Sequence, residues 1–538
     1  MGKRKWLGAV SILAAAGLVT ACGTSGTASS SNGTANATAN ATANATNTTA
    51  NASTNASGAS TGGSTSVLYV GLSADPPSLD PSTSSALVDR QIMMNIYDTL
   101  FQLTPQKTVT PDLVKSYVVS PNGLTYTLTL HKNIQFQDGT PFNAAAVKFN
   151  LVRDMAKSSP RRSSLIDISS IDTPNDTTVV LHLKKPFSPL IAVLAGRAGM
   201  MVSPTAVQKE GSNFVNDPVG SGPFMFKSRI KGDNLILVRN PHYWNGEPAL
   251  KKVVYRIFTD PNVELANLQS GAVQIVDTVP PQQLSSMEQN SQYVVSNTPG
   301  LGYGGFYLNC QTAPFNNVDL REAVNLAINR TTLVNAMLKG SAVPGYSPFS
   351  PASPVYSASE DAPPTPNPAT IKSLLAKAGD PNGFSFTMQS PNDSVDEQMA
   401  TILQSMLSQY GIKMNIEQLE FGTLLGNADN HNFQASLLGW SGRLDPDQDI
   451  YAFLYTNGSL NDSGYSNIQV DALLNKARET SSMSARKVLY KQAMNIIHQQ
   501  APYVYLDHPD NIYAYSKQLQ GFQAYADGVL RLKNLSLS

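Results

Sequence analysis

Residues 23–66 consist entirely of Ser, Thr, Asn, Ala and Gly, and this segment limits where the chain can fold. It has no charged residue and no bulky apolar residue, and an imperfect Ala-Asn-Ala-Thr repeat runs through residues 35–46. Such a sequence cannot bury enough apolar surface to offset the chain entropy that is lost on folding. We therefore expect a disordered tether, followed by a folded body over residues 67–538.

The N-terminus has the pattern of an exported lipoprotein. Basic residues at 3–5 precede an apolar run over Trp6–Val19, which is shorter than the roughly 20 residues that cross a bilayer and fits a signal peptide. Small residues then lead to Cys22, as in a bacterial lipobox. We predict a signal peptide at residues 1–21, a lipid on Cys22 and a linker over residues 22–66. The alternative is an ordinary cleavage site beside an incidental cysteine.

Composition excludes several classes of protein for the body. The chain has 38 basic and 38 acidic residues, so removal of the signal leaves a slight negative charge and no electrostatic reason to expect nucleic acid. Cys310 is the only cysteine besides Cys22, which excludes a disulfide within the body. The six histidines do not lie at metal-ligand spacing, and the sequence has no nucleophile elbow and no phosphate loop. We expect no metal site, no cofactor and no catalytic residues.

Apolar periodicity predicts a mixed α/β body, because strands and helices alternate along the chain. The predicted strands are 67–72, 125–130, 179–183, 235–238, 253–258, 273–276, 306–309, 384–388, 413–416, 433–438 and 501–506. The predicted helices include 88–100, 144–153, 263–268, 470–477 and 487–499. A body of this length should contain two or three domains.

Two further helices have recognisable ends. Asn317 can cap the clearest helix of the chain, whose apolar face continues to Leu338 before Gly340 ends it. The residues Ser394-Val395-Asp396-Glu397 have the pattern of a capping box and predict a helix that begins there and ends at Gly411.

The stretch 439–453 combines a strand end with a glycine-flanked turn. An apolar run over residues 435–438 leads into it, and Gly439 and Gly442 bracket Trp440. Asp445-Pro446-Asp447 then predicts a turn. A strand that opens into such a turn is a place where the backbone can approach a ligand. Packing and a turn without a ligand are the simpler interpretation of these residues taken alone.

Eleven short motifs occur in a fixed order through the body. They are Asp112-Leu113 with Tyr126, Phe136-Gln137-Asp138-Gly139, Gly220-Ser221-Gly222-Pro223, Arg239-Asn240-Pro241-His242-Tyr243-Trp244, Ser270-Gly271, Asn309, Arg321-Glu322-Ala323, Gly439-Trp440, Asp445-Pro446, Tyr465-Ser466-Asn467 with Val470-Asp471, and Ala501-Pro502. Each motif alone is a turn or a cap that many folds use. In their order and separation they resemble the family 5 extracellular solute-binding proteins, which are the dipeptide, oligopeptide, glutathione and nickel receptors of ABC importers.

The resemblance implies a type II periplasmic-binding-protein fold, an α/β architecture with two lobes around a hinged cleft and an inserted third domain. Domain I would combine residues 67–103, 217–300 and 506–538. Domain II, the insertion, would span 104–216, and domain III would span 301–505. The hinge would lie at residues 301–309 and 503–508, and the solute would bind between domains I and III.

The resemblance also implies the residues that line the cleft. In peptide receptors of the family, the Gly-Trp turn pairs with an extended peptide as an added strand would, which assigns Gly439, Trp440 and Ser441 here. The loop after the first strand lines the other wall, which assigns Ser84 and Ser85.

Two positions depart from the peptide receptors. An Asp that binds the ligand's α-amino group is replaced by Arg443, which would attract a carboxylate or a phosphate instead. Asp445 or Asp447 could substitute for that Asp, and the alternative role for Arg443 is an ion pair with one of them. The Arg that binds the ligand's carboxylate in dipeptide receptors is also missing, because the matching position here is about Ser390, which is uncharged.

The candidate ligand-binding residues are therefore Gly439, Trp440, Ser441, Arg443, Asp445, Ser84, Ser85, Ser390 and Asn392. We expect a monomeric, lipid-anchored protein of the cell envelope, on the outer face of the membrane or in the periplasm, that delivers a peptide or peptide-like solute to the transmembrane subunits of an ABC permease. The alternatives are a signalling receptor of the same fold, or a binder of an opine, an oligosaccharide or a metal chelate.

Overall fold

A 12-stranded mixed sheet runs through the part of the chain that the computed structural model describes, residues 66–538. The predicted signal peptide, Cys22 and the linker up to residue 65 lie outside the described residues. The main path of the sheet has the order β16-β15-β17-β13-β18-β11-β1-β10-β9-β8, and β12 and β14 pair with β18 beside this path.

The sheet has a half that begins with the first strand. It contains β1 (Val67–Leu72), β8 (Phe224–Ile230), β9 (Asn234–Arg239), β10 (Lys252–Ile257), β11 (Ile275–Val276) and β12 (Tyr293–Pro299). β1 is parallel to β10 and β11, while β9 is antiparallel to β10. Helix α1 (Leu87–Ile96) packs on this half, and its buried apolar residues belong to the same core as β1.

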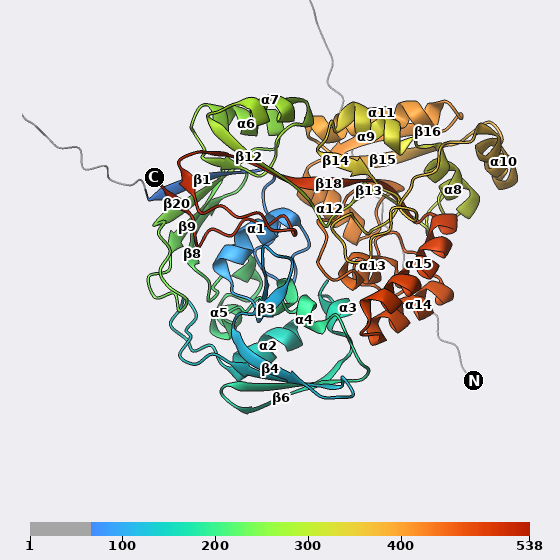
Figure 1. Ribbon diagram of the computed structural model, residues 1–538. Helices are drawn as coiled ribbons and strands as arrows, with labels where there is room; N and C mark the ends of the chain where they lie inside the picture. The colour runs from blue at the N-terminus through green and yellow to red at the C-terminus, as the bar shows by residue number, and fades with distance from the viewer. Residues whose placement is uncertain (1–65) are drawn as a thin grey trace, which may run out of the picture. The chain divides into compact units, whose positions relative to one another are not determined.

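The other half contains β13 (Gly304–Leu308), β14 (Ala342–Pro344), β15 (Ser385–Pro391), β16 (Lys413–Leu419) and β17 (Ala435–Leu437). Helices α13 (Asp447–Leu454), α14 (Ile468–Glu479) and α15 (Met483–Gln500) surround a second core on this side (Figure 1). The predicted strands and helices in both halves are present, and most of their ends lie within a few residues of the prediction; the exceptions are the last strand and the helix predicted from Asn317.

One strand belongs to both halves. β18 (Tyr503–Ser516) pairs with β13 and β14 through its first residues and with β11 and β12 through its last residues. The sequence predicted only its first part, because Asp507 and His508 interrupt the apolar run. Both are buried in the structure, and His508 lies 2.9 Å from the carboxylate of Asp361. A partner from a distant segment therefore allows the strand to continue through polar residues.

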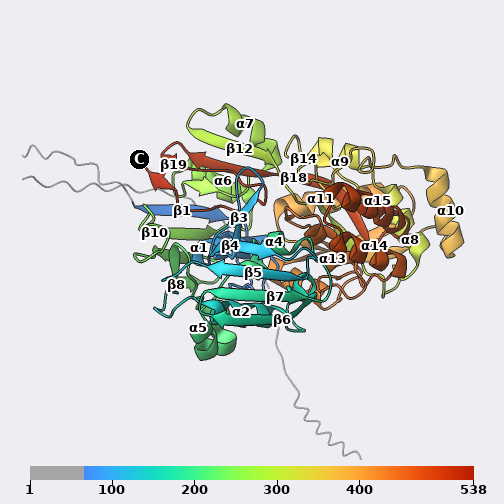
Figure 2. The ribbon, with the colours of Figure 1, turned by 60° about the horizontal axis from the view of Figure 1, so that its bottom comes forward.

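A separate four-stranded sheet forms the centre of the third part of the body. Its order is β4-β5-β7-β6, with β4 (Val114–Val119), β5 (Thr125–Leu130), β6 (Ile168–Asn175) and β7 (Thr178–Leu183). Helix α2 (Ala144–Asp154) packs on it, and the two enclose an apolar core of their own (Figure 2). These residues lie within the predicted insertion, although the exact domain boundaries stay a prediction.

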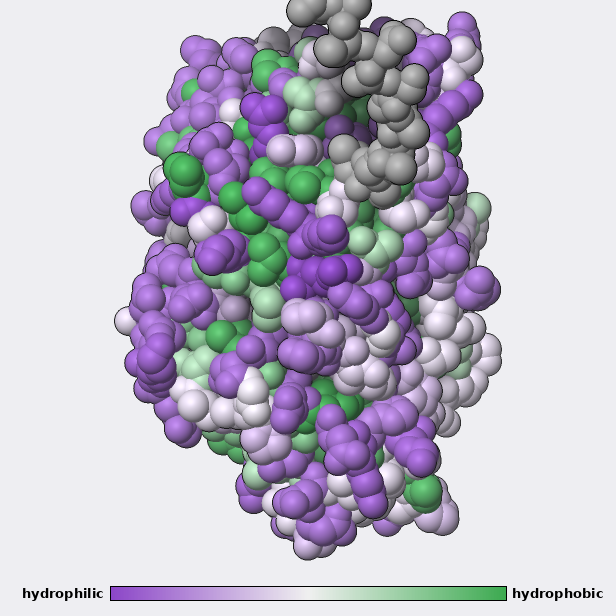
Figure 3. Space-filling model, turned by 90° about the vertical axis from the view of Figure 1, so that its left-hand side faces the viewer, coloured by the Kyte–Doolittle hydropathy of each residue, from purple (hydrophilic) through white to green (hydrophobic). Residues whose placement is uncertain are grey.

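The remaining elements are shorter or peripheral. They are β2 (Phe101–Leu103), β3 (Val109–Pro111), β19 (Leu519–Gln520), β20 (Ser536–Leu537), α3 (Arg162–Leu165), α4 (Leu190–Val193), α5 (Pro204–Glu210), α6 (Pro261–Gln269), α7 (Leu284–Gln289), α10 (Pro368–Ala378), α12 (Phe421–Asp429), η1 (Arg197–Gly199), η2 (Gly211–Asn216) and η3 (Pro281–Gln283). On the face in Figure 3, polar side chains interrupt the apolar ones. None of the described helices is long and apolar enough to span a bilayer.

Two predictions about helix ends were wrong. The helix expected from Asn317 to Gly340 is divided into α8 (Val318–Ala327) and α9 (Arg330–Met337), because the side chain of Asn329 accepts a hydrogen bond from the backbone of Thr332 and begins a new helix. The N-cap of α11 (Ser394–Ser408) is Asp393, whose carboxylate accepts from the backbone N–H groups of Val395 and Asp396. Ser394 is the first helical residue.

The break at Asn329 can be tested by stability. In a continuous helix, Asn329→Ala would raise helix propensity and leave the protein unchanged or slightly more stable. At an N-cap, the same change removes a hydrogen bond to an otherwise unpaired N–H group. We expect Asn329→Ala to lower the free energy of unfolding by about 1 kcal/mol in urea denaturation. Thr331→Ala, an exposed substitution in the same helix, is the control and should change little.

Candidate functional site

The backbone of the turn after β17 is tied to the start of β13. The backbone N–H of Trp440 donates to the carbonyl of Tyr303, and the backbone N–H of Tyr303 donates to the carbonyl of Trp440, both at 2.9 Å. Trp440 therefore has no free backbone group for an added strand. Gly439 is exposed, and Trp440 and Ser441 are half-buried, so these three residues are the accessible part of the turn.

Gly442 sets how closely this turn approaches the other half of the molecule. Its φ is +69°, and a Cβ atom there would lie 2.1 Å from the carbonyl carbon of Leu301. Leu301 belongs to the link between β12 and β13. Only glycine fits this conformation and this contact, so the turn rests directly on the chain segment that joins the two halves of the sheet.

Trp440 and Asp449 form the centre of the site. The indole N–H of Trp440 donates to Oδ1 of Asp449 at 3.0 Å, and the backbone N–H of Arg443 donates to the same oxygen at 2.8 Å. Oδ2 of Asp449 is buried and has no hydrogen-bond partner. Burial raises the pKa of this carboxyl well above its ordinary value, and the Arg443 charge opposes that shift.

Sequence reasoning missed Asp449. The substitutes considered for the Asp of the peptide receptors were Asp445 and Asp447, on the assumption that the loop is one residue shorter here. The signal that could have identified Asp449 is its position in the first turn of α13. A side chain in the first turn of a helix can reach back to the loop that precedes the helix, and that of Asp449 reaches Trp440.

Asp445 and Asp447 are each held by an arginine from a distant helix. Asp445 forms a bidentate pair with Arg486 of α15, with 2.9 Å between Oδ2 and Nη1. Asp447 forms a bidentate pair with Arg478 of α14, at 2.9 and 3.0 Å. All four side chains are buried. These pairs fix the start of α13, and the two carboxylates are fully engaged within the protein.

Arg443 makes no ion pair, so the predicted alternative of a pair with Asp445 or Asp447 was wrong. Among residues 66–538, no carboxylate oxygen lies within 4.0 Å of its guanidinium nitrogens. Nη1 donates instead to the hydroxyl of Ser441 at 3.2 Å and to the carbonyl of Gly442 at 2.5 Å. The guanidinium also stacks over the ring of Trp440, 4.2 Å from its centroid.

The loop after β1 meets this turn through other arginines. Ser84 is buried; its hydroxyl accepts from Nε of Arg197 at 3.0 Å, and its carbonyl accepts from Nη2 of Arg161 at 3.0 Å. Across the site, the hydroxyl of Ser441 accepts from Arg90 of α1 at 3.3 Å. Ser84 was predicted from the loop after β1, and Ser441 and Arg443 were predicted from the turn after β17. The structure brings the two stretches close together: after burial, the nearby charges of Arg90, Arg197 and Arg161 lower the pKa of Arg443.

Three other predicted residues do not take part in these contacts. Ser85 lines a cavity of about 290 Å³ together with Ser159, Ser459 and other residues. Ser390 is buried at the end of β15, where its hydroxyl donates to the carbonyl of Pro391. Asn392 is exposed. In the described part of the chain, neither Ser390 nor Asn392 hydrogen-bonds to the residues around Trp440.

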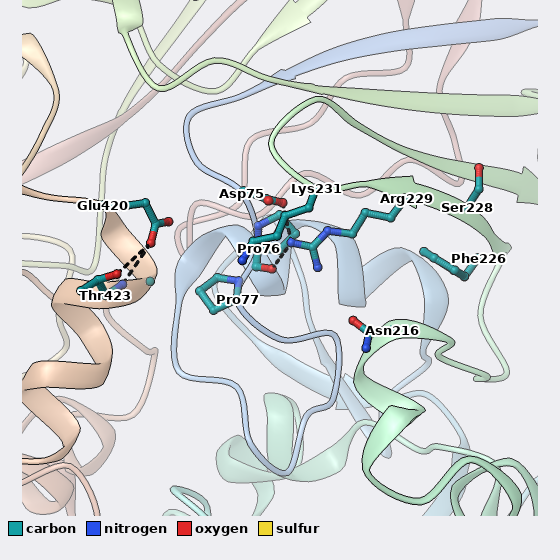
Figure 4. A pocket seen from close by; sticks show the side chains of 11 residues that line it. Asp75, Pro76, Pro77, Asn216, Phe226, Ser228, Arg229, Lys231, Glu420 and Thr423 are labelled. Atoms are coloured by element: carbon teal, nitrogen blue, oxygen red, sulfur yellow. Dashed lines mark hydrogen bonds and ion pairs between the residues drawn. The ribbon is translucent and has the colours of Figure 1, made fainter.

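A larger cavity of about 730 Å³ lies between the loop after β1 and the start of α12 (Figure 4). Asp75, Arg229 and Lys231 line one side, and Glu420 and Thr423 line the other. It contains none of the nine predicted ligand residues. Among residues 66–538, no cluster of three His, Cys, Asp or Glu side chains could hold a metal ion. Burial raises the pKa of the Cys310 thiol, which disfavours a reactive thiolate.

Comparison with known proteins agrees with this architecture. A family model described as "Bacterial extracellular solute-binding proteins, family 5 Middle" matches residues 108–461. The glutathione-binding protein GsiB of Escherichia coli O6:K15:H31 (strain 536 / UPEC) is 33% identical over 473 residues, which cover 85% of this chain and 92% of GsiB.

Solved structures resemble this chain over nearly the whole of its folded body. DppA from Helicobacter pylori, an ABC transporter-associated periplasmic binding protein in complex with the peptide STSA, has a TM-score of 0.82 at 28% identity and covers 88% of this chain and 98% of its own. AgaA from A. tumefacien R10, in complex with agropinic acid, has a TM-score of 0.82 at 26% identity and covers 88% and 99%.

The sheet shared by two halves, the inserted four-stranded sheet and the similarity to these complexes define a solute-binding protein of the periplasmic-binding class. The predicted α/β fold class is therefore confirmed. The chain belongs to the bacterial extracellular solute-binding proteins, family 5.

The pairing of Asp445 with Arg486 leads to a stability prediction. Asp445→Ala leaves a buried guanidinium without its partner and should lower the free energy of unfolding by about 3–5 kcal/mol. Lys491→Ala removes a pair with Glu360 that is much more exposed, and it should cost at most about 1 kcal/mol. Denaturant unfolding of both variants measures the difference. Equal losses would contradict a structural role for Asp445.

Proposed function

We propose that this chain is the receptor of an ABC importer and captures a peptide or peptide-like solute between the loop that contains Ser84 and the turn that contains Trp440. The observation that carries this proposal is the unpartnered Oδ2 of Asp449, which lies beside the half-buried Trp440. A buried carboxylate with one free oxygen is suited to accept hydrogen bonds from a solute's ammonium group. The relatives GsiB and DppA, named for glutathione binding and solved with a peptide, support a solute of this class.

We infer from the same contacts that the site binds and delivers the solute rather than catalysing a reaction. Asp449 has no histidine, cysteine or metal cluster among its described neighbours, and its bonds hold Trp440 and the Arg443 backbone in place. We infer that the solute leaves unchanged. We further infer that the chain acts as a monomer, tethered through a lipid on Cys22 to the extracytoplasmic face of the membrane, and that it docks on the permease subunits.

Solute binding can be measured by isothermal titration and thermal shift on the full chain. Reduced glutathione, the dipeptide Met-Leu and agropinic acid form the first panel, since relatives are named for or solved with these solutes. We expect at least one peptide-like member to raise the stability by about 2.7 kcal/mol when its concentration is 100 times its Kd. No stabilisation by any peptide-like solute would contradict the proposal.

Asp449→Asn is the matched test of the site. It keeps the size of the side chain and the oxygen that accepts from Trp440, but it replaces the unpartnered Oδ2 with an NH2 group, which cannot accept a hydrogen bond from an ammonium group. We expect about 10- to 100-fold weaker binding of the solute that the panel identifies. Lys377→Gln, which breaks an exposed pair with Asp319, is the control and should bind normally.

The lipid anchor can be tested with the only two cysteines of the chain. In cells labelled with radioactive palmitate, Cys22→Ala should lose the label and move from the membrane fraction to the soluble extracytoplasmic fraction. Cys310→Ala should keep both the label and the membrane location. Labelled protein that persists in Cys22→Ala would place the modification elsewhere.

A further inference from the structure

Four buried arginines converge at the site from four different segments. Arg90 lies on α1, Arg161 immediately precedes α3, Arg197 begins η1, and Arg443 lies in the turn after β17. Their exposed fractions are 2%, 7%, 1% and 6%. Arginine is rarely buried without a carboxylate partner, so a group of four calls for a specific physical reason.

Two serines hold these side chains together. The hydroxyl of Ser441 accepts from Nη2 of Arg90 at 3.3 Å and from Nη1 of Arg443 at 3.2 Å. Ser84 accepts from Arg197 through its hydroxyl and from Arg161 through its carbonyl, each at 3.0 Å. The acceptors are thus neutral oxygens, which orient the guanidiniums without neutralising them.

The protein leaves a nitrogen atom of every one of the four guanidiniums without a partner. These atoms are Nε of Arg90, Nε of Arg161, Nη1 of Arg197 and Nη2 of Arg443, and all are buried. In the part of the chain that the structure describes, only Arg90 has a carboxylate within 4.0 Å, that of Asp527 at 3.9 Å. Asp527 makes a closer pair with Arg531, at 2.6 Å.

The electrostatics agree with this geometry. Burial lowers the pKa of Arg197 and of Arg443 well below the ordinary value, and for both residues the neighbouring arginines of the group add to the effect. The nearest acids cancel this positive charge only in part: burial raises the pKa of Asp154 to about 8, which leaves that carboxyl mainly neutral at pH 7, whereas Asp89, whose pKa burial raises to about 6, stays mainly ionised. The group therefore has excess positive charge and free donors.

We propose that Arg90, Arg161, Arg197 and Arg443 form the subsite for the acidic groups of the solute, and that the solute carries at least two carboxylates. This inference rests on the proposed function, because it specifies the class of solute that the receptor captures. Two carboxylates supply four oxygen atoms, which match the four free nitrogens. Asp449 would hold an ammonium group of the same solute, so the preferred class is an amino acid derivative or short peptide with an additional acid.

A cavity lies next to the segments of Ser84 and Arg161, and it is lined by their chain neighbours rather than by the four arginines themselves. Thr83 and Ser85, the chain neighbours of Ser84, line the cavity of about 290 Å³ together with Pro160, the neighbour of Arg161. This volume is close to the lower end of the range for pockets that bind small molecules, about 300 Å³. The segments that carry the arginines also belong to different predicted domains, so binding of the acid groups would hold those domains together by cancelling their mutual repulsion.

The stability of the free protein distinguishes a ligand subsite from a structural cluster. If the arginines are uncompensated, Arg161→Gln or Arg197→Gln removes repulsion, and the thermal midpoint of the ligand-free protein should stay constant or rise. If they are structural partners of Asp154 and Asp89, the same variants should lower the midpoint, which would overturn the proposal. Arg239→Gln, which breaks a partly exposed pair with Glu247, is the matched control.

Affinity for matched solutes gives the second measurement. Titration would compare glutathione, which has two carboxylates, with glutathione amide, which has one, and Ala-Glu with Ala-Gln. We expect the member with the extra carboxylate to bind at least about 10-fold more tightly, and Arg161→Gln or Arg443→Gln to reduce that advantage about 10-fold or more. Arg239→Gln should retain it. Inorganic phosphate is the probe for a different anion.

Each outcome has a defined meaning. Equal binding of acidic and neutral partners, unchanged in the arginine variants, overturns the dicarboxylate subsite and leaves the peptide receptor intact. Stabilisation by phosphate alone, with no response to any dicarboxylate, also overturns it. No binding of any solute overturns the proposed function together with this inference. A carboxylate preference that the arginine variants abolish supports both.

Discussion

The hydrogen-bonded ladder of β18 is the constraint on which the rest of the structure depends. This strand pairs with β13 and β14 at one end and with β11 and β12 at the other, so it is part of both halves of the sheet. Leu301 and Gly302 run beside it and support the turn at Gly442. The site around Trp440 is therefore positioned by the same segment that joins the two halves of the sheet.

Buried charge sets the chemistry of that site. Arg478 and Arg486 are matched by Asp447 and Asp445 and stabilise the start of α13. Arg90, Arg161, Arg197 and Arg443 leave free donors instead. The first two arginines are structural because each is paired with a carboxylate. The other four fit a ligand-binding role, since an uncompensated buried charge is costly unless a ligand neutralises it.

Much of the fold could be predicted from local pattern. Alternation at Thr125–Leu130 and helical spacing at Ala144–Asp154 reflect burial of one face, which needs only the neighbouring residues. The helix break at Asn329 and the cap at Asp393 escaped prediction, because several nearby polar residues could serve and tertiary packing selects among them. The continuation of β18 through His508 depends on Asp361, which lies far away in the sequence.

The sequence by itself determined the class of the protein, because ordered turn and cap motifs are local in origin, and it proposed the Gly-Trp turn as part of the site. It also identified Ser84, Ser441 and Arg443 as candidates. Only the tertiary structure decided which aspartate lies beside Trp440 and which arginines share the site with Arg443. Pairing between charges depends on distances between segments hundreds of residues apart, and no local spacing encodes which carboxylate reaches which guanidinium.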